Sequence, residues 1–405
     1  MITVERLTLK ADGFAQGIIV PRTLPGEEVE GAIADGQITQ PRIVTPSPDR
    51  VAAPCRHYRA CGGCALMHAS DGFVAGWKQE VVRHALTAQG LDAALRPILT
   101  SPPQSRRRAT LAGRRLKSGA LVGFHARASD TVTAIPDCRL LDPVLLAAIP
   151  ALQELVAQGG SRKGEMKLTV TAFDQGVEVA ATGGKPLDTA LRIALPQIAA
   201  RHGLARLAWD GEVLMQPEPP TLGLGRARVS PPPGAFLQAT PQGEAALRNA
   251  VQEAVGPARR IADLFAGCGT FALPLAETAE VLAVEGSAAM LAALDQGWRM
   301  APGLKRVTCE TRDLFRRPLM PDELAGFEAV VIDPPRAGAE AQVAELARAD
   351  VPVIAAVSCN PVTFARDARA LVQAGYRLDW VQVVDQFRWS AHVELAARFT
   401  RAHIG

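Results

Sequence analysis

Residues 260–272 read RIADLFAGCGTFA, an apolar, strand-like run that leads into a loop with two closely spaced glycines. Gly267 and Gly269 let the chain turn tightly and bring backbone N–H groups near a ligand. Strand-like runs recur downstream as EVLAVE, EAVVIDP and VPVIAAVS, and helical stretches alternate with them. This alternation predicts a doubly wound, Rossmann-like α/β domain with a parallel sheet.

The composition limits the kind of protein this is. The chain has 405 residues, of which 48% are hydrophobic and 21% are charged, so we expect a folded protein of two or three domains. No apolar run approaches the ~20 residues that span a bilayer, and the N-terminus lacks the pattern of a secretory signal. A cytoplasmic protein without a membrane partner is expected, and its seven cysteines are read as reduced, metal-bound or catalytic.

Turn signals and changes of pattern divide the chain into three parts. Residues 1–45 alternate weakly and are rich in turn sequences, which predicts a small all-β domain. Residues 46–230 open with a linker-like segment and continue as a mixed α/β domain, with a helix expected near 76–89. The run VSPPPGAF marks a boundary near Ser230, and residues 231–405 form the domain with the parallel sheet.

A basic run lies at Ser105–Lys117, which reads SRRRATLAGRRLK and contains no acid. Taken alone, such a run indicates a solvated basic edge. Together with the chemistry described below, a surface that contacts phosphates is the better interpretation. The net charge of +3 adds only weak support for an anionic partner.

Acidic residues follow the predicted strands. Glu285 ends the strand VLAVE, where a carboxylate can bind two ribose hydroxyls, and Asp313 in TRDLF is expected to end the third strand and reach an adenine. These features fit NAD and S-adenosylmethionine equally well, and each acid alone is also consistent with a solvated strand end. Asp333 lies in VVIDPPRAG, where two prolines stiffen the loop. That loop favours an enzyme that holds a flat base beside a methyl donor over a dehydrogenase.

Cys359 follows the fifth strand, in the sequence SCNPVTF. Asn360 suits a helix N-cap and Pro361 the first helical position, so the thiol precedes a helix N-terminus, where the dipole favours thiolate. An inert buried thiol is the alternative. Carbon 5 of uracil accepts a methyl group only after a nucleophile adds to carbon 6, and a base must then remove the proton from carbon 5. Glu394, in the predicted strand HVELAARF, is the candidate base, although alone it suggests a solvated acid.

The segments DLFAGCGTF, AVEGS, VIDPPRAG, SCNPVTFARD and HVE, together with FLQ at 236–238, closely resemble the RNA uracil-5 methyltransferases, which are class I S-adenosylmethionine-dependent enzymes. The resemblance implies that Cys359 is the nucleophile and Glu394 the base. It assigns to the cofactor pocket and target base Gln238, Phe265, Thr270, Glu285, Asp313 and Asp333. Two departures stand out, because Phe387–Ser390 reads FRWS where the family has F-P-x-T, and Thr240 replaces an asparagine.

Four cysteines lie upstream of this domain, at Cys55, Cys61, Cys64 and Cys138. The spacing alone allows zinc or iron–sulfur. The resemblance extends to the ribosomal-RNA branch of the family, which carries a [4Fe–4S] cluster on this motif, and implies a structural rather than electron-carrying cluster. Residues 1–45 resemble a shortened TRAM domain, an OB-like barrel that binds RNA.

The leading hypothesis is therefore methylation of a uridine in 23S ribosomal RNA by a monomeric enzyme. Methylation of transfer RNA is an alternative, although that branch lacks the TRAM domain and the cluster. Methylation of an exocyclic amine leaves the SCNP segment unexplained. A non-catalytic RNA-binding iron–sulfur protein would require the loss of Cys359 or Glu394, and both are present.

Overall fold

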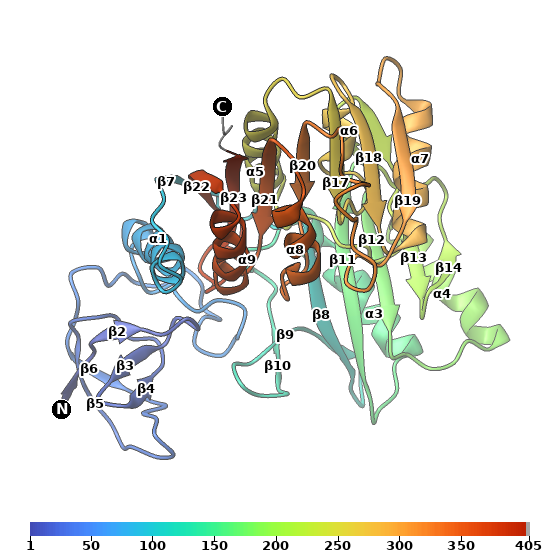
Figure 1. The fold of residues 1–405 in the computed structure, drawn as a ribbon. Coiled ribbons are helices and arrows are strands. Elements are labelled where there is room, and N and C mark those ends of the chain that lie inside the picture. Colours follow the sequence, from blue (N-terminus) through green and yellow to red (C-terminus); the bar gives the residue numbers. More distant parts are fainter. Residues whose placement is uncertain (402–405) are drawn as a thin grey trace.

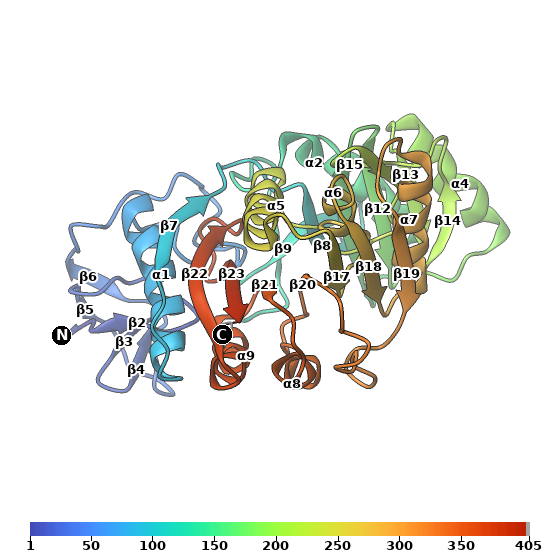
Figure 2. The ribbon, with the colours of Figure 1, turned by 45° about the horizontal axis from the view of Figure 1, so that its top comes forward.

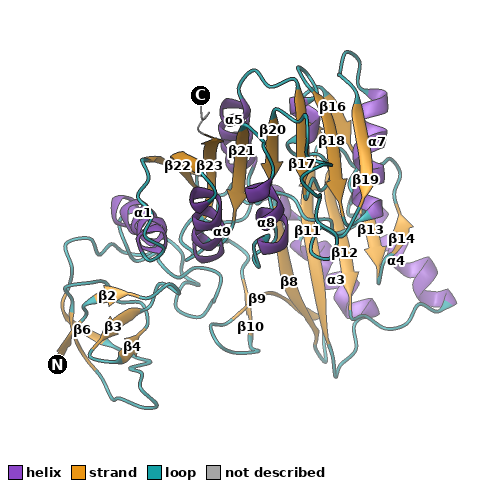
Figure 3. Ribbon diagram, viewed as in Figure 1, coloured by secondary structure: helices purple, strands orange, loops and turns teal. Residues whose placement is uncertain are grey.

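A computed structural model describes residues 1–401 of the chain. The N-terminal module contains two three-stranded sheets, β1-β5-β6 and β2-β3-β4, and lies at one end of the molecule (Figure 1). Its strands are β1 (Ile2–Thr3), β2 (Arg6–Leu7), β3 (Gly13–Ala15), β4 (Ile18–Val20), β5 (Glu28–Glu30) and β6 (Arg42–Thr45). A small apolar core formed by Val4, Val20, Val29 and Ile38 lies within it. Residues 46–70, which follow, contain no helix or strand (Figure 3).

The central domain is built on a seven-stranded sheet with the order β10-β9-β8-β11-β12-β13-β14. Its strands are β8 (Arg108–Arg115), β9 (Ala120–His125), β10 (Val132–Ala134), β11 (Glu165–Phe173), β12 (Gly176–Thr182), β13 (Arg206–Trp209) and β14 (Glu212–Met215). Its helices are α2 (Pro143–Ala147), α3 (Ile149–Gly159) and α4 (Thr189–Arg201). Leu152 and Leu155 of α3 pack with Leu168 and Val170 of β11 in one buried cluster. A hairpin of β15 (Leu222–Leu224) and β16 (Ala227–Val229) leads to the last domain.

The C-terminal sheet has eight strands in the order β19-β18-β17-β20-β21-β23-β22-β7. They are β17 (Arg260–Leu264), β18 (Glu280–Glu285), β19 (Val307–Thr311), β20 (Ala329–Ile332), β21 (Val353–Ser358), β22 (Tyr376–Asp385), β23 (Glu394–Arg401) and β7 (Leu95–Thr100). The first five strands of that order are parallel, as the alternating pattern predicts. β23 runs antiparallel to β21 and β22, so the antiparallel pair predicted near the C-terminus is present.

Helices cover both faces of this sheet, because its strands are apolar on both sides. The helices α5 (Pro241–Val255), α6 (Ala272–Leu275) and α7 (Ala288–Met300) contribute to the core on one face. The helices α8 (Glu340–Arg348) and α9 (Pro361–Gln373) contribute to the core on the other. Figure 2 shows α5 on one side of the strands and α8 and α9 on the opposite side.

One predicted boundary needs correction. Residues 71–100 were assigned to the central domain, but α1 (Asp71–Thr87) packs on α9, and β7 pairs with β22 at the edge of the C-terminal sheet. Val82 and Leu86 of α1 are buried in the same core as α8 and α9. The physical reason is that the sequence pattern of a helix or strand shows which of its faces is apolar, but does not show which sheet that face packs against. Within residues 1–401, no helix is long and apolar enough to cross a membrane.

Candidate active site

A cavity of about 480 Å³ opens at the carboxyl ends of the parallel strands. Ligands bind at this edge in open α/β sheets, because the loops that leave neighbouring strands diverge there. All eight predicted site residues of this domain line the cavity: Gln238, Phe265, Thr270, Glu285, Asp313, Asp333, Cys359 and Glu394. Its volume is in the range of small-molecule and cofactor sites.

The glycine loop and Glu285 form one end of this cavity. Phe265 and Gly267 have positive φ angles of 63° and 57°, which fold the chain sharply after β17. The N–H of Gly267 donates to Glu285 Oε2 at 3.0 Å, and the N–H of Ser287 donates to Oε1 at 2.8 Å. The carboxylate is therefore held in place by the backbone. Such a fixed acceptor can bind ribose hydroxyls, as the sequence predicts.

Asp313 lies two residues beyond β19 rather than at its last residue. Its Oδ1 accepts the N–H of Phe315 at 3.0 Å, and its side chain is 50% exposed. The rings of Phe315 and Phe265 lie 5.4 Å apart between centroids, and both line the cavity. This end of the cavity thus combines a carboxylate with two aromatic rings, which suits a heterocycle.

Three further ionisable residues line the same cavity, Asp333, Cys359 and Glu394, and they lie close enough for their charges to interact. Burial and the nearby Asp333 carboxylate raise the pKa of Glu394 to about 8. Burial also raises the pKa of Asp333 to about 7. Burial and the charges of Glu394 and Asp333 raise the pKa of the Cys359 thiol to about 11, against a lowering effect of Arg336.

That shift corrects the expectation that the helix N-terminus favours thiolate at Cys359. The helix begins as predicted, with Asn360 Oδ1 accepting the N–H of Val362 at 3.1 Å and Pro361 as its first residue. Burial and two neighbouring carboxylates outweigh the helix dipole, whose effect is modest and short-ranged. The thiol is therefore protonated at neutral pH in the protein by itself.

Two residues of the site were not predicted. Arg336 follows the prolines of the Asp333 loop, lines the cavity and places Nη2 at 2.6 Å from His392 Nδ1. Gln386 lies behind the cavity wall, is 1% exposed and donates from Nε2 to Gln238 Oε1 at 2.6 Å. Arg336 could have been found from its place after DPP, whereas nothing in the sequence around Gln386 indicates its role.

The loop that carries the sequence FRWS is firmly anchored without the family's proline. Lys78 Nζ donates to Asp385 Oδ1 at 2.5 Å and to the Phe387 carbonyl at 3.1 Å. The Trp389 carbonyl accepts the N–H groups of Ala65 and Leu66 at 2.7 and 2.9 Å. Trp389 itself is buried and has a positive φ of 60°. Hydrogen bonds to distant parts of the chain therefore hold this loop, where a proline would hold it by restricting its φ angle.

Thr240, the other departure, acts as a helix cap. Its Oγ1 accepts the N–H of Gly243 at 2.9 Å, which caps α5, and lies 2.7 Å from Ser101 Oγ. Both hydroxyls are buried. Thr240 does not line the cavity, so its substitution for asparagine affects the helix start and not the cavity wall.

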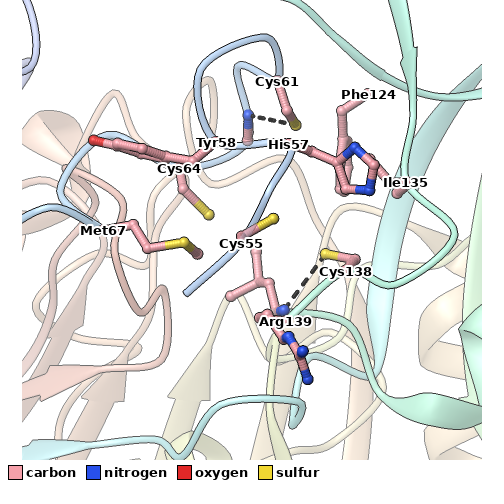
Figure 4. A pocket seen from close by; sticks show the side chains of 12 residues that line it. Cys55, His57, Tyr58, Cys61, Cys64, Met67, Phe124, Ile135, Cys138 and Arg139 are labelled. Carbon is pink, nitrogen blue, oxygen red and sulfur yellow. Dashed lines mark hydrogen bonds between the residues drawn. The ribbon is translucent and has the colours of Figure 1, made fainter. Parts of the chain in front are cut away.

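The four upstream cysteines line one small, apolar cavity in the central domain (Figure 4). Its other walls include Met67, Phe124, Ile135 and Leu140. All four thiols are free, and burial together with the neighbouring thiols raises the pKa of Cys61 and Cys138. Across residues 1–401, no three His, Cys, Asp or Glu side chains are arranged to hold a single metal ion.

Gly62 allows the chain between these cysteines to pass close to another strand. A Cβ atom at Gly62 would lie 2.8 Å from the carbonyl oxygen of His125, where the N–H of Gly62 donates at 2.9 Å. The glycine is therefore needed for this close backbone approach.

The basic run Ser105–Lys117 is not the open phosphate-binding surface that was expected. Arg107 pairs with Glu244, and Arg108 donates to the carbonyls of Ala235 and Gly234. Arg114 pairs with Glu165 at 2.9 Å. Arg107 and Arg108 hold the central and C-terminal domains together, because they bond to an acid and to carbonyls of the C-terminal domain. Arg114 and Glu165 instead join two strands of the central sheet. The acidic partners of Arg107 and Arg114 are distant in sequence, so the run contains no acid of its own.

Several known proteins are similar to this chain in sequence. A family model described as tRNA (Uracil-5-)-methyltransferase matches residues 234–401. An uncharacterized RNA methyltransferase of Brucella suis is 44% identical over 404 residues, which cover 99% of this chain and 97% of that protein. The 23S rRNA (uracil(1939)-C(5))-methyltransferase RlmD of Chromohalobacter salexigens is 33% identical and covers 99% of this chain and 89% of its own.

A solved structure shares the whole fold. The Pyrococcus abyssi tRNA (uracil-54, C5)-methyltransferase, in complex with S-adenosyl-L-homocysteine, superposes with a TM-score of 0.78 at 23% identity over 98% of each chain. At this identity the likeness concerns the fold. Sequence relatives and the family model, taken together, show that the chain belongs to the S-adenosylmethionine-dependent RNA uracil-5 methyltransferases.

Proposed function

We propose that this enzyme methylates carbon 5 of a uridine in 23S ribosomal RNA through a transient bond between Cys359 and carbon 6 of the base. The observation that carries the proposal is that Cys359, Asp333 and Glu394 line the same cavity as the glycine loop and Glu285. A covalent nucleophile, a carboxylate and a nucleoside site are the parts that this reaction requires.

The residues of the cavity fit the cofactor. Glu285 offers an oriented carboxylate for ribose hydroxyls, and the rings of Phe265 and Phe315 offer apolar surface for an adenine. Bound S-adenosylmethionine supplies an electrophilic methyl group. The volume of about 480 Å³ admits a nucleoside beside a second flat ring.

In the proposed chemistry, Cys359 adds to the base and Glu394 removes the proton from carbon 5. Cys359 and Glu394, both protonated at neutral pH in the protein by itself, first give their protons to water. The thiolate then adds to carbon 6 of uracil, and the electron pair of the double bond between carbons 5 and 6 moves into an enolate of the ring. Carbon 5 would then take the methyl group of a bound sulfonium, whose sulfur would keep the electron pair of the broken bond. Glu394, as carboxylate, removes the hydrogen from carbon 5, the double bond between carbons 5 and 6 re-forms, and the sulfur leaves as thiolate.

The experiment that tests this mechanism uses RNA in which the target carries 5-fluorouridine. Fluorine at carbon 5 cannot be removed by a base, so the protein stays bonded to the RNA after methyl transfer. Wild-type protein should give a band of protein–RNA adduct on a denaturing gel, and Cys359→Ala should give none. The matched control Cys309→Ser removes a half-buried thiol of β19 and should leave the adduct intact. Adduct formation by Cys359→Ala would contradict the role of this residue.

The choice of 23S ribosomal RNA rests on the relative named RlmD, which covers nearly the whole chain. Transfer RNA is the second candidate, because the solved relative of the same fold is named a tRNA methyltransferase. Mapping 5-methyluridine in both RNAs from a deletion strain, complemented with wild type or Cys359→Ala, separates the two. A site that returns only with wild type identifies the substrate.

We also infer that Cys55, Cys61, Cys64 and Cys138 hold a [4Fe–4S] cluster. Four thiols in one apolar cavity repel each other as thiolates and need a cationic group to be stable there. A single zinc ion requires four sulfurs about 2.3 Å from one point, and the described cysteines line a cavity without such convergence. A larger polynuclear group suits this arrangement better, and its role would be structural, since methyl transfer moves no net electrons.

We infer, finally, that RNA lies along a groove beside the N-terminal module, which the sequence likens to a TRAM domain. The groove has a volume of about 930 Å³ and is lined by five arginines, Arg22, Arg42, Arg50, Arg56 and Arg59. No acidic residue of the described chain lines it. Arg42, Arg50 and Arg56 have acidic partners, whereas Arg59 has none within residues 1–401. Exposed guanidinium groups of this kind bind phosphates.

A further inference from the structure

A series of three hydrogen-bonding groups lies at the wall of the cavity, next to Glu394. The backbone N–H of Ala239 donates to Gln386 Oε1 at 2.8 Å, and Gln386 Nε2 donates to Gln238 Oε1 at 2.6 Å. Amide side chains can be placed in two orientations that differ by exchange of oxygen and nitrogen, so their direction has to be deduced from their partners. Here the first partner settles it, because a backbone N–H can only donate.

The consequence is a hydrogen-bond donor of fixed direction in the cavity wall. Gln386 must turn its oxygen to Ala239, so its nitrogen faces Gln238 and takes up the oxygen of that amide. Gln238 is 3% exposed and lines the cavity. Its Nε2 hydrogens have no partner within the described chain, and because Gln238 lines the cavity they can donate to a ligand there.

The surroundings hold Gln386 rigidly. It is 1% exposed, and its side chain fits against Gly243 of α5, where an added Cβ would lie 2.5 Å from the Cβ of Gln386. Arg107 Nε donates to the backbone carbonyl of Gln238 at 3.1 Å, which fixes that residue from the other side. Gln386 also lies within hydrogen-bonding reach of the Glu394 carboxyl. The free donor of Gln238 is therefore placed beside the residue proposed to act at carbon 5.

We propose that Gln386 is a positioning residue that fixes Gln238 as a donor to a carbonyl oxygen of the target base, and so selects uracil over cytosine. Uracil presents an oxygen acceptor at position 4, as thymine does, whereas cytosine presents an amino donor there. A donor of fixed direction therefore forms a hydrogen bond with uracil. With cytosine it would face the amino group, so two donors would oppose each other without an acceptor. Sites built on a buried hydrogen bond reject the mismatched analogue strongly. The inference rests on the proposed function, since it assigns the base at that site.

The test uses Gln386→Glu, which should reverse the direction of the hydrogen bond between residue 386 and Gln238. A carboxylate at this position accepts from Ala239 and has no hydrogen for Gln238, so the Gln238 amide should flip and present its oxygen to the cavity. Adduct formation is measured on two otherwise identical RNAs whose target is 5-fluorouridine or 5-fluorocytidine. We expect wild type to prefer fluorouridine, and Gln386→Glu to lower that preference by at least about tenfold.

Two further variants protect the test from a loss of folding. Gln386→Met keeps the volume of the side chain and removes its hydrogen bonds to Ala239 and Gln238. It should lower the preference for fluorouridine by a smaller factor than Gln386→Glu does. Gln342→Met is the matched control, because Gln342 is equally buried and bonds the backbone of Leu319 at 2.8 and 3.1 Å, outside the cavity. It should affect stability and leave the preference for uracil unchanged.

The outcomes separate the inference from the function beneath it. An unchanged preference in both folded Gln386 variants overturns the inference. A raised KM for S-adenosylmethionine with an unchanged preference also overturns it and assigns the Gln238 donor to the cofactor. If wild type forms no adduct with either RNA, the covalent mechanism fails and the inference with it.

Discussion

The N–H of Leu66 lies 2.9 Å from the backbone carbonyl oxygen of Trp389, and the N–H of Ala65 shares that oxygen. Leu66 follows Cys64 by two residues, and Trp389 precedes Glu394 by five. This contact joins the cysteine cavity to the loop that leads into β23. A change at Cys64 can therefore reach the loop that precedes Glu394, although the two residues line separate cavities.

The first prediction concerns that link. Cys64→Ser should lower methylation by about tenfold to a hundredfold, because small displacements of reacting groups have effects of this size. Backbone amides of residues 386–393 should also exchange faster with deuterium, as measured by mass spectrometry. Cys309→Ser should change neither quantity. If methylation slows but the amides of this loop do not exchange faster, the cysteine cavity does not act on Glu394 through this loop.

Glu394→Gln tests the release step. The amide keeps the size of the side chain but cannot take the proton from carbon 5, so methylated adduct should form and persist. We expect adduct breakdown to slow by about 10²–10⁴-fold, the usual contribution of a general base, in a chase experiment on denaturing gels. Glu340→Gln, an exposed position on α8, serves as control. Normal turnover by Glu394→Gln would remove this residue from the role.

The raised pKa of Glu394, at about 8 instead of the ordinary 4.5, makes stability depend on pH. The folded protein keeps this proton up to about pH 8, whereas the unfolded chain releases it near 4.5. The free energy of unfolding should therefore fall as pH rises between these values, by up to about 1.4 kcal/mol per pH unit for one proton. Urea unfolding of wild type and Glu394→Gln at pH 5 and pH 8 measures this, and the variant should show the smaller fall.

The buried ion pair of Lys78 and Asp385 should contribute strongly to stability. Both side chains are at most 1% exposed, and Asp385 also accepts the N–H of Phe387 at 3.1 Å. Lys78→Met leaves that carboxylate without its cation, which should lower the free energy of unfolding by about 3–5 kcal/mol. Arg192→Ala, which breaks an exposed pair with Glu212, should lower the free energy of unfolding far less, because water and salt screen exposed charges. Equal losses in denaturant unfolding would contradict the assignment.

Arg59→Ala tests the proposed RNA groove. Removing one phosphate contact should weaken RNA binding for all sequences and reduce the slope of log K against log salt by about 1. Filter binding at several salt concentrations measures both. Arg162→Ala, an exposed arginine in the central domain away from the groove, should leave the slope unchanged. An unaltered slope in Arg59→Ala would place the RNA elsewhere.

Much of the site could be predicted from local sequence. The strand, tight turn and helix at residues 260–272, and the cap and first turn of α9, depend on neighbours within a few positions. Carboxyl ends of parallel strands necessarily meet at one edge, so the prediction that Glu285, Asp333 and Cys359 share a cavity followed from their place after each strand. The antiparallel return of β23, with Glu394 at its start, was similarly visible in the alternation of apolar residues.

The amino-acid sequence by itself thus determined the parallel sheet, the side chains that follow its strands at one edge, and the family of the protein. Tertiary structure alone decided that α1 and β7 join the C-terminal sheet, that Arg107 and Arg108 bond to the C-terminal domain, and that burial raises the pKa of Cys359. It also decided the direction of the Gln238 amide, which depends on a residue 148 positions away. The reason is physical: dielectric surroundings and hydrogen-bond partners belong to positions in space, and a linear pattern records only neighbours along the chain.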